Sequence, residues 1–285
     1  VLVTVTNGLG QVTNVPVVVT NWVGQGANSF VSSICALPDN RVVLGGSFSS
    51  VAGTNFNRVA RLLATNGAAD ITFTNLPGFN GSVNTLAVRP NARVVVGGSF
   101  SRPTAGIAQL RPNATQDTLF DPGAGVDAAV HGVWVLPDES VLLGGAFTNC
   151  NGTPAARVAR LTPDGGLDTS FPVSAITNGT VYAVAVQSNG KVLVGGDLVL
   201  NTGTNRVHLA RFHPDGSLDS TFNVGTGPNA TVYTLALQSQ GKVIIGGDFS
   251  AVNGIPRNRY ARLHGDGRVD LTLFGTRPNS VLSLL

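Results

Sequence analysis

The sequence contains no methionine and few charged residues. Charged side chains make up 12% of its 285 residues, with only two lysines, Lys191 and Lys242, and one glutamate, Glu139. The net charge of +3 arises because acids are scarce, since the arginines are spread along the chain and form no run. This pattern lacks the basic footprint of a nucleic-acid-binding protein, so we expect no such partner. No run of 18 apolar residues occurs, so we expect no membrane span.

Cysteine and histidine are also rare. Cys35 and Cys150 are the only cysteines. They fall at different positions of non-neighbouring repeats, which predicts free thiols, because a disulfide needs Cα atoms within about 7 Å. The four histidines form no HExxH or Cys/His ligand spacing, so we expect no metal centre of that kind.

Glycine, in contrast, is abundant and regularly placed. A Gly-Gly pair within a run of Val, Leu and Ile occurs five times, as in VVLGGSF at 42–48 and VIIGGDF at 243–249. The pairs are Gly45 and Gly46, Gly97 and Gly98, Gly144 and Gly145, Gly195 and Gly196, and Gly246 and Gly247. A valine precedes each pair by 14 residues, and a sixth such valine is Val281. A period near 50 residues indicates a repeat architecture.

Each repeat carries four short strand signals separated by turn residues, with no sustained helical period. In the fifth repeat these are TVYTLALQ, KVIIGGDFS, RYARLH and RVDLTLF. Four strands in about 50 residues, repeated radially, predict an all-β fold: a β-propeller of four-stranded blades. The first strand is apolar on both faces, so we expect neighbouring sheets to cover both. Gly-Gly in the second strand is interpreted as the place where the next blade packs on bare backbone.

An Arg and an Asp recur on the hairpin formed by the third and fourth predicted strands. The pairs are Arg61 and Asp70, Arg160 and Asp168, Arg211 and Asp219, and Arg262 and Asp270, with Gln109 opposite Asp117 in the second repeat. We interpret them as hydrogen-bonded clamps within each blade. A phenylalanine follows the Asp by three residues in four repeats, and we interpret it as packing between blades.

This repeat resembles the delta-60 repeat family of bacterial β-propeller proteins, whose units run like GKILVGGDF…NG…RIARL…DGSLDTTF. The fifth repeat matches through GKVIIGGDFSAVNG, RYARL and GDGRVD, and the fourth through GKVLVGGD and HPDGSLDSTF. The second repeat departs most, with a shortened loop and Gln109 for Arg. The resemblance covers about residues 24–285 and implies a propeller in a secreted or cell-surface protein, without implying a reaction.

The two ends do not follow the unit. Residues 1–23 are predicted to form an N-terminal β-hairpin and resemble the last hairpin of bacterial immunoglobulin-like domains. The propeller is assigned to 24–285, with repeats at about 24–75, 76–122, 123–173, 174–224 and 225–275 and a partial unit at 276–285. We expect SVLSLL at the C-terminus to pair near the N-terminal hairpin, which gives five full blades and a composite sixth. Five blades, or a fragment of a longer array, remain alternatives.

The turns of the TPDGGLD and HPDGSLD kind resemble calcium loops, but Thr162 and His213 replace the first carboxylate. A plain turn is therefore favoured over a Ca²⁺ site, and no cofactor is expected. The longer loops share one propeller face, where binding residues tend to gather. Candidates on this long-loop face are Asp121, Asp127, His131, Asn151, Asp197, Asp248, Arg257 and Arg259.

Two functional hypotheses follow. The leading one is a non-catalytic, secreted or cell-surface scaffold that binds protein or glycan or assembles with copies of itself. The alternative is a hydrolase or lyase that acts on polysaccharide at the central mouth. A glycosidase needs two carboxylates across the scissile bond. Because Asp197 and Asp248 follow Gly-Gly in adjacent repeats, we consider them a possible acidic pair, and we name no catalytic residue.

Overall fold

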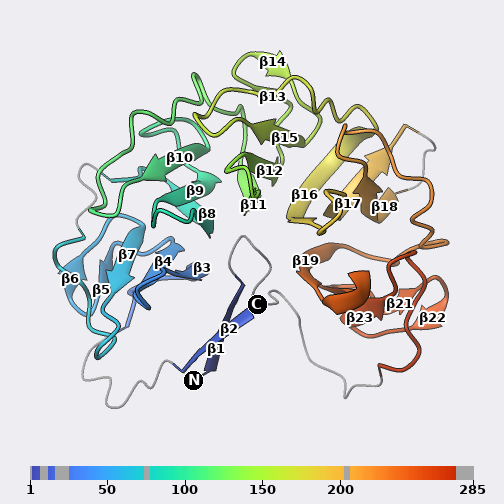
Figure 1. Cartoon of the computed structure of the whole chain (residues 1–285), viewed down its shortest axis with the longest axis horizontal. Coiled ribbons are helices and arrows are strands. Elements are labelled where there is room, and N and C mark those ends of the chain that lie inside the picture. The colour runs from blue at the N-terminus through green and yellow to red at the C-terminus, as the bar shows by residue number, and fades with distance from the viewer. Residues whose placement is uncertain (1, 7–11, 17–25, 74–77, 202–205, 274–285) are drawn as a thin grey trace.

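The computed structural model describes residues 2–6, 12–16, 26–73, 78–201 and 206–273. Within these residues the chain is almost entirely β, with a single 3₁₀ turn, η1 (Ser239–Gly241), and no helix that would serve as a transmembrane span. Five three-stranded antiparallel sheets stand around a common centre (Figure 1). The predicted β-propeller is therefore confirmed. We number these sheets, with their loops, as blades one to five.

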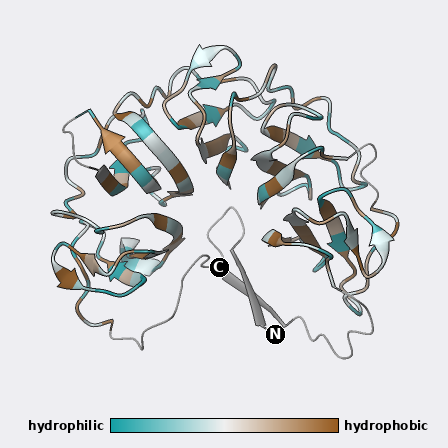
Figure 2. Cartoon of the chain, turned by 180° about the vertical axis from the view of Figure 1, so that it is seen from behind, coloured by the Kyte–Doolittle hydropathy of each residue, from teal (hydrophilic) through white to brown (hydrophobic). Residues whose placement is uncertain are grey.

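The strands of the blades, from the innermost outward, are β3 (Val31–Ala36), β4 (Val42–Gly46) and β7 (Val59–Leu62); β8 (Ser82–Val88), β9 (Val94–Ser99) and β10 (Ile107–Leu110); β11 (Val130–Val135), β12 (Val141–Gly145) and β15 (Val158–Leu161); β16 (Ile176–Val186), β17 (Val192–Leu200) and β18 (Arg206–Phe212); β19 (Val232–Leu237), β20 (Val243–Gly247) and β23 (Tyr260–Leu263). The first strand of every blade lies nearest the common centre (Figure 1). Hydrophobic (brown) and hydrophilic (teal) residues both occur along the strands of the blades (Figure 2).

Short hairpins decorate the connections between second and third strands: β5 (Ser50–Val51) with β6 (Thr54–Asn55), β13 (Asn149–Cys150) with β14 (Thr153–Pro154), and β21 (Ala251–Val252) with β22 (Ile255–Pro256). In blade four, β17 and β18 instead extend their own ladder to Val199 and Arg206. At the N-terminus, β1 (Leu2–Thr6) pairs with β2 (Val12–Pro16), so the predicted hairpin is present as a separate two-stranded sheet.

The fourth strand of each blade differs from the prediction. In place of a strand, the chain makes one isolated bridge to the third strand, such as Leu62 to Ala69 and Leu263 to Val269. The repeated Asp explains the difference. In blade one, Asp70 Oδ1 accepts a hydrogen bond from the amide of Thr72 at 3.0 Å and turns the chain away from the sheet. A local side-chain-to-backbone bond of this kind competes with the ladder.

At each joint between blades, apolar side chains of one inner strand pack against the first glycine of the preceding blade. A Cβ added to Gly97 would lie 2.7 Å from Cγ1 of Val130 and 2.8 Å from Cγ2 of Val133, both on the inner strand of the next blade. Gly45 meets Val83, and Gly195 meets Val232, in the same way. The interpretation of the first glycine as a place of close approach between blades is confirmed.

The second glycine of each pair has a different cause. A Cβ on Gly98 would overlap the carbonyl oxygen of Ser82, and one on Gly247 would overlap that of Thr231. These carbonyls belong to the start of the inner strand of the same blade or to the residue just before it. The pair therefore combines one contact between blades with one contact inside the blade, which explains why two glycines recur together.

The outer part of the joint uses the repeated arginine in blades one, three and four. Arg61 Nε donates to Asp70 Oδ2 at 2.8 Å, as predicted, while its Nη1 donates to the carbonyl of Pro112 in the next blade at 2.5 Å. Its guanidinium also lies 4.4 Å from the ring centre of Phe73. Phe73 in turn joins a core cluster that spans blades one and two. The arginine thus links the two hairpin segments, the phenylalanine and the following blade.

Blade two achieves the same joint from another position. Gln109 replaces the arginine and donates to Asp117 at 2.9 Å. Arg89, at the end of the inner strand, supplies the missing guanidinium: its Nη1 donates to the carbonyl of Pro163 at 2.8 Å, and it lies 5.3 Å from the ring centre of Phe120. Arg89 therefore takes the place of the arginine that the motif lacks in this blade, although it comes from a different position in the sequence.

Blade one exposes the surface that the other blades bury. Val31 is 38% exposed and Ile34 42%, whereas their equivalents in blade two, Val83 and Leu86, are 0% and 8% exposed. The neighbouring Phe30 is 80% exposed. This is the side that a preceding blade covers elsewhere in the ring. The expected composite sixth blade stays a prediction, because residues 274–285 lie outside the described residues.

The glycine joint predicts a sharp difference between two glycines. Gly97→Ala should lower the free energy of unfolding by about 1–3 kcal/mol, because its methyl group meets Val130 and Val133 with no room to relax. Gly26→Ala is the control: nothing lies within 4 Å of the place its added methyl group would take, and a change below about 0.5 kcal/mol is expected. Urea unfolding measures both. Equal midpoints for the two variants would contradict the close-packed joint.

The arginine of blade two predicts a rescue. Arg89→Gln should destabilise the protein by about 1–3 kcal/mol, because the carbonyl of Pro163 loses its donor. Adding Gln109→Arg should recover much of that loss, because an arginine at 109 occupies the position used in blades one, three and four. A double-mutant cycle on unfolding free energies measures the coupling. Additive losses would show that the two positions do not replace each other.

Candidate functional site

A β-bulge recurs in every inner strand, close to its start except in β16, which begins earlier, at Ile176. The register with the second strand shifts just after the repeated valine, for example between Val130 and Gly132 and between Val232 and Thr234. Bulges redirect a side chain, and they are frequent beside binding sites. The bulged residues of blades one to five are Ser32, Asn84, His131, Tyr182 and Tyr233. They lie at the end of the inner strands that adjoins the long loops.

The bulged side chains of blades three to five form an aromatic row. The ring centres of His131 and Tyr182 are 5.2 Å apart, with a tilt of 48° between their planes. Tyr182 and Tyr233 are also 5.2 Å apart and meet at 66°, as an edge against a face. These are favourable geometries for aromatic pairs. All three rings are half-buried, and burial lowers the pKa of His131, which favours a neutral imidazole.

The row ends at an ion pair in blade five. Tyr233 donates its hydroxyl to Asp248 Oδ2 at 2.9 Å, and Arg259 contacts Asp248 Oδ1. The Asp248 side chain is 48% exposed and that of Arg259 33% exposed. The hydrogen bond to Asp248 raises the pKa of Tyr233. We define His131, Tyr182, Tyr233, Asp248 and Arg259 as the mouth row.

Asp127, predicted as a binding residue, instead holds a loop in place. Its Oδ1 accepts the amides of Thr148 and Asn149 at 2.7 and 3.0 Å, and its Oδ2 accepts the Thr148 hydroxyl at 2.6 Å. Although burial acts to raise the pKa of Asp127, these hydrogen bonds outweigh it and hold the pKa well below the usual range of an aspartate. Such a carboxyl is a poor general acid.

The same clamp exists in three other blades, where the residue is asparagine. Asn80 Oδ1 accepts the amides of Ser101 and Arg102 at 2.9 and 3.0 Å, and Asn28 and Asn229 act equivalently. Blade four, with its extended ladder, departs from this pattern. The clamp joins the segment before the inner strand to the loop after Gly-Gly. Sequence reasoning missed this repeated position, although the constant offset of 21 residues from acceptor to loop was a signal for it.

The remaining predicted residues do not gather at one place. Asn151 adopts a left-handed φ of 49°, and its Oδ1 accepts the amide of Ala124 at 3.1 Å, so it shapes its loop. Arg257 donates to the carbonyl of Asp270 at 3.4 Å, on the outer segment of blade five. Asp197 lies in β17, with its Oδ1 3.8 Å from Nδ1 of His208. Asp197 and Asp248 thus each lie beside a basic group of their own blade.

Asp121 lies on the opposite side from the expected one. Its amide donates to the carbonyl of Asp164 at 2.7 Å, in the tight turn of blade three, and its Oδ1 accepts the amide of Gly123. The outer segment curls away before it reaches the long-loop face. The linker therefore starts at the tight turns, and only its later part climbs to the loop that carries Asp127.

The turn aspartates hold their own backbone. Asp215 Oδ1 accepts the amide and the hydroxyl of Ser217 at 2.9 and 2.6 Å. Asp164 Oδ1 accepts the hydroxyl of Thr162. Among the described residues, no three acidic, histidine or cysteine side chains come together as metal ligands would. These contacts account for the acids as turn residues. Cys35 and Cys150 are free and buried, and burial raises the pKa of their thiols to about 12 and about 11.

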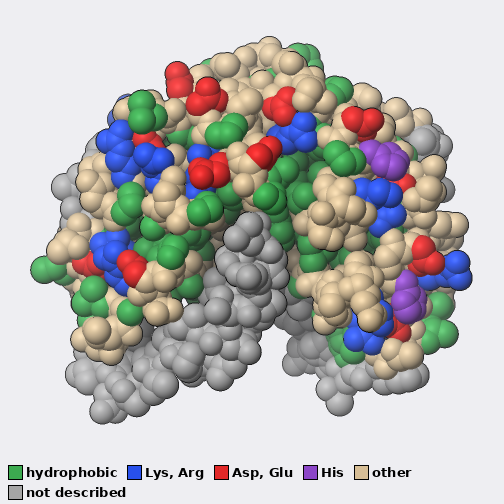
Figure 3. All heavy atoms as spheres, viewed as in Figure 1, with side chains coloured by type: hydrophobic (Ala, Val, Ile, Leu, Met, Phe, Trp, Pro, Cys, Tyr) green, Lys and Arg blue, Asp and Glu red, His purple; other side chains and the backbone are tan. Residues whose placement is uncertain are grey.

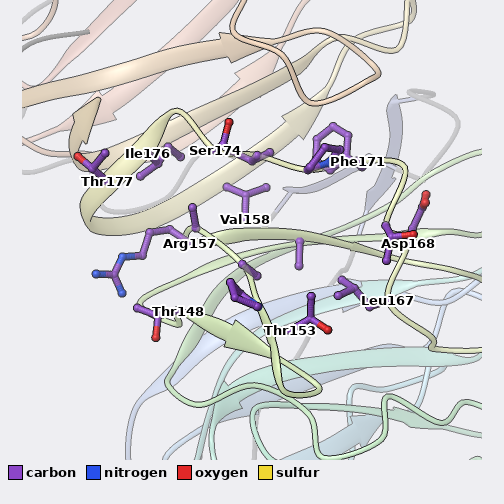
Figure 4. A pocket seen from close by; sticks show the side chains of 17 residues that line it. Thr148, Thr153, Arg157, Val158, Leu167, Asp168, Phe171, Ser174, Ile176 and Thr177 are labelled. Carbon is purple, nitrogen blue, oxygen red and sulfur yellow. The ribbon is translucent and has the colours of Figure 1, made fainter. Parts of the chain in front are cut away.

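A separate pocket of about 450 Å³ lies on the outer flank of blade three. Val158, Leu167, Phe171 and Ile176 form much of its apolar wall, with Asp168 at one end and Arg157 at the other (Figure 4). It lies where a full fourth strand would run beside β15. Its wall also includes Ile176 and Thr177, at the start of β16, so the pocket adjoins the inner strand of blade four that carries Tyr182 further along.

Charges on the face seen in Figure 3 lie as interspersed blue and red groups rather than as a patch of one sign. This agrees with the repeated ion pairs, such as Arg160 with Asp168 and Lys191 with Asp219. A long-range field of one sign, which would steer a polyanion, is not a feature of this face.

Asp127 predicts a substitution that the repeat itself supplies. Asp127→Asn installs the residue of blades one, two and five, so unfolding free energy at pH 7 should change by less than about 1 kcal/mol, whereas Asp127→Ala should cost about 1–3 kcal/mol. Because the folded pKa of Asp127 is lowered, its stabilising contribution is present above the unfolded value near 4 and is lost as pH falls. Wild type should therefore lose stability relative to Asp127→Asn on acidification. An unchanged difference between pH 7 and pH 3 in urea titrations would contradict the clamp.

Solved structures with the same fold include enzymes and a scaffold. The catalytically inactive virginiamycin B lyase of Staphylococcus aureus with quinupristin has a TM-score of 0.53 at 13% identity, over 92% of this chain and 74% of that one. A streptogramin B lyase and the WD40 β-propeller domain of Doa1 both have TM-scores of 0.50 at 15% identity, with 86% and 85% of this chain and 70% and 74% of theirs covered. At such identities the likeness concerns the fold alone. Among curated proteins, no sequence relative is found.

A family model matches residues 37–73, 136–171, 187–222 and 238–273, about half of the chain. Each match runs from the end of an inner strand to the phenylalanine after the repeated Asp, or to its equivalent position in blade five. The second repeat, where Arg89 replaces the usual arginine, is not among the matched ranges. Residues 1–23 are not matched either, so their resemblance to an immunoglobulin-like hairpin stays a prediction. The chain belongs to the family described as a domain of unknown function (DUF5122) beta-propeller.

Proposed function

We propose that this protein is a non-catalytic binding scaffold, secreted or displayed at the cell surface, whose ligand contacts the long-loop face at the mouth row. The mouth row is the observation that carries the proposal. It places half-buried aromatic side chains on the inner strands of blades three to five, next to a charged pair that flanks the second and third strands of blade five, and the packed joints hold these strands rigid. Binding residues on such a scaffold lose little conformational freedom when they meet a ligand.

The chemistry of the carboxylates supports binding over catalysis. A glycosidase needs a protonated and an ionised carboxyl facing each other across a bond. Asp127 spends its oxygens on loop amides and hydroxyls, and its lowered pKa disfavours the protonated form. Asp248 is half-exposed but is engaged by Tyr233 and Arg259. A hydrolase or lyase at the central mouth is therefore the less well supported function.

The location outside the cell rests on composition. Few charges, and a surface rich in Asn, Thr, Ser and Gly, favour an extracellular protein. The face in Figure 3 offers no basic patch for nucleic acid. The partner is accordingly expected among extracellular or cell-surface macromolecules, protein or glycan, including copies of this chain.

A face-specific set of variants tests the proposal. In one variant His131, Tyr182 and Tyr233 are replaced by serine, which blade one carries as Ser32. The control replaces His213, which is half-buried, and His264, which is exposed, by serine; both lie beside the tight turns. Arrays of purified glycans and extracellular proteins are probed with each labelled protein. We expect capture by wild type and by the control, and at least a tenfold loss for the mouth-row variant.

Capture that survives the mouth-row changes, or no capture by wild type, would count against a ligand at this face. Polysaccharide turnover is assayed in parallel with Asp127→Asn and Asp248→Asn. Turnover by wild type that either variant abolishes would replace the binding proposal with the enzymatic one.

A further inference from the structure

Two further positions of the repeat carry different residue types in different blades. The position after the second glycine is Ser47 in blade one, Ser99 in blade two and Ala146 in blade three, but Asp in blades four and five. The bulge position carries serine, asparagine and histidine in blades one to three, and tyrosine in blades four and five. Blades four and five therefore each carry a tyrosine and an aspartate, Tyr182 with Asp197 and Tyr233 with Asp248, at positions where the joints accept small neutral residues.

The arginine of blade five is also diverted from its usual role. Arg58 and Arg157 donate through Nη1 to the backbone carbonyls of Ser47 and Ala146. Arg259, at the equivalent place, contacts the Asp248 carboxylate instead. The half-exposed pair presents carboxylate acceptors and guanidinium donors side by side, and its charges cancel.

From this juxtaposition we propose that the mouth row over blades four and five binds a neutral carbohydrate chain, an inference that rests on the proposed function. An aromatic side chain offers an apolar surface with a polar tip, which suits the apolar face of a sugar ring. Neighbouring hydroxyls of a sugar both donate and accept, so they match a carboxylate beside a guanidinium. A few placed polar groups within an aromatic lining are typical of small-molecule sites.

The neutral pair sets the charge of the ligand. A cationic sugar would compete with Arg259 for Asp248, and an anionic one would compete with Asp248 for Arg259. Either exchange disrupts the hydrogen bond between Tyr233 and Asp248 or leaves a charge half-buried without its partner, which is costly. A neutral sugar adds hydrogen bonds without displacing either group. The same argument disfavours uronic acids and amino sugars with free amines.

The test uses the whole chain and sugar hexamers of three charge types in calorimetric titrations. Cellohexaose and maltohexaose are the neutral probes, hexagalacturonate is the anionic probe, and chitosan hexamer is the cationic one. We expect a neutral hexamer to bind at least tenfold more tightly than both charged probes. Asp248→Ser, which installs the residue of blades one and two, should weaken that binding at least tenfold, as should Tyr182→Ser. Tyr233→Phe, which keeps the ring and removes its hydroxyl, should weaken it less.

The matched control is Asp215→Ser, on the opposite face, with no expected change in affinity. Thermal unfolding shows whether each variant is folded, and Tyr233→Phe keeps the test open if Tyr182→Ser does not fold. Preference for a charged hexamer, or neutral binding that ignores Asp248→Ser, would overturn the inference. If the mouth row captures a protein and no sugar, the carbohydrate inference fails and the binding face stands. If neither a sugar hexamer nor any glycan or protein of the arrays binds, the proposed function fails together with the carbohydrate inference.

Discussion

The whole architecture depends on a close approach between an inner strand and a glycine of the preceding blade. Val83 in blade two, and its equivalents in blades three to five, are fully buried because Gly45 and its equivalents have no side chain to hold them off. Interiors are packed densely enough that one methyl group matters. The distance between blades is therefore set by the Cβ atom that glycine lacks. The other contacts of the joint, including the hydrogen bond from the arginine to the next blade, depend on that distance.

The same constraint explains why blade one is unlike the others. Val31 and Ile34 have the size and position of buried knobs, yet they are more than a third exposed. Burying such side chains contributes about 1.5–3 kcal/mol each. These two residues fit a neighbouring sheet that has a glycine at the position facing them. The composite sixth blade expected from the sequence would supply such a sheet. The residues of each repeat thus determine the surface that the neighbouring blade must present as well as the fold of the blade itself.

The sequence predicted what repeats and failed where a contact is local or compensated. The Gly-Gly joints, the Arg–Asp clamps and the phenylalanine packing could be predicted, because each imposes a fixed residue type at a fixed spacing. The fourth strand could not: its pattern is strand-like, but Asp70 and its equivalents divert the backbone within two residues. Arg89 escaped notice because its equivalence to the other arginines is spatial. Asp121 was predicted on the wrong face because a full fourth strand would have carried the chain up to the long-loop face before this residue.

The candidate site could be found only from the structure, because its residues differ in type from those at the same repeat position in other blades. His131, Tyr182 and Tyr233 occupy one position of the repeat, which other blades fill with serine or asparagine, so a search for recurring motifs passes over them. Once the scaffold accounts for the glycines, clamps and turn acids, the positions left unexplained are few, and they lie together at the bulged ends of the inner strands. In a repeat protein, regular residues serve folding, and the positions that depart from the repeat without completing a joint between blades are the ones on which the proposed binding function rests.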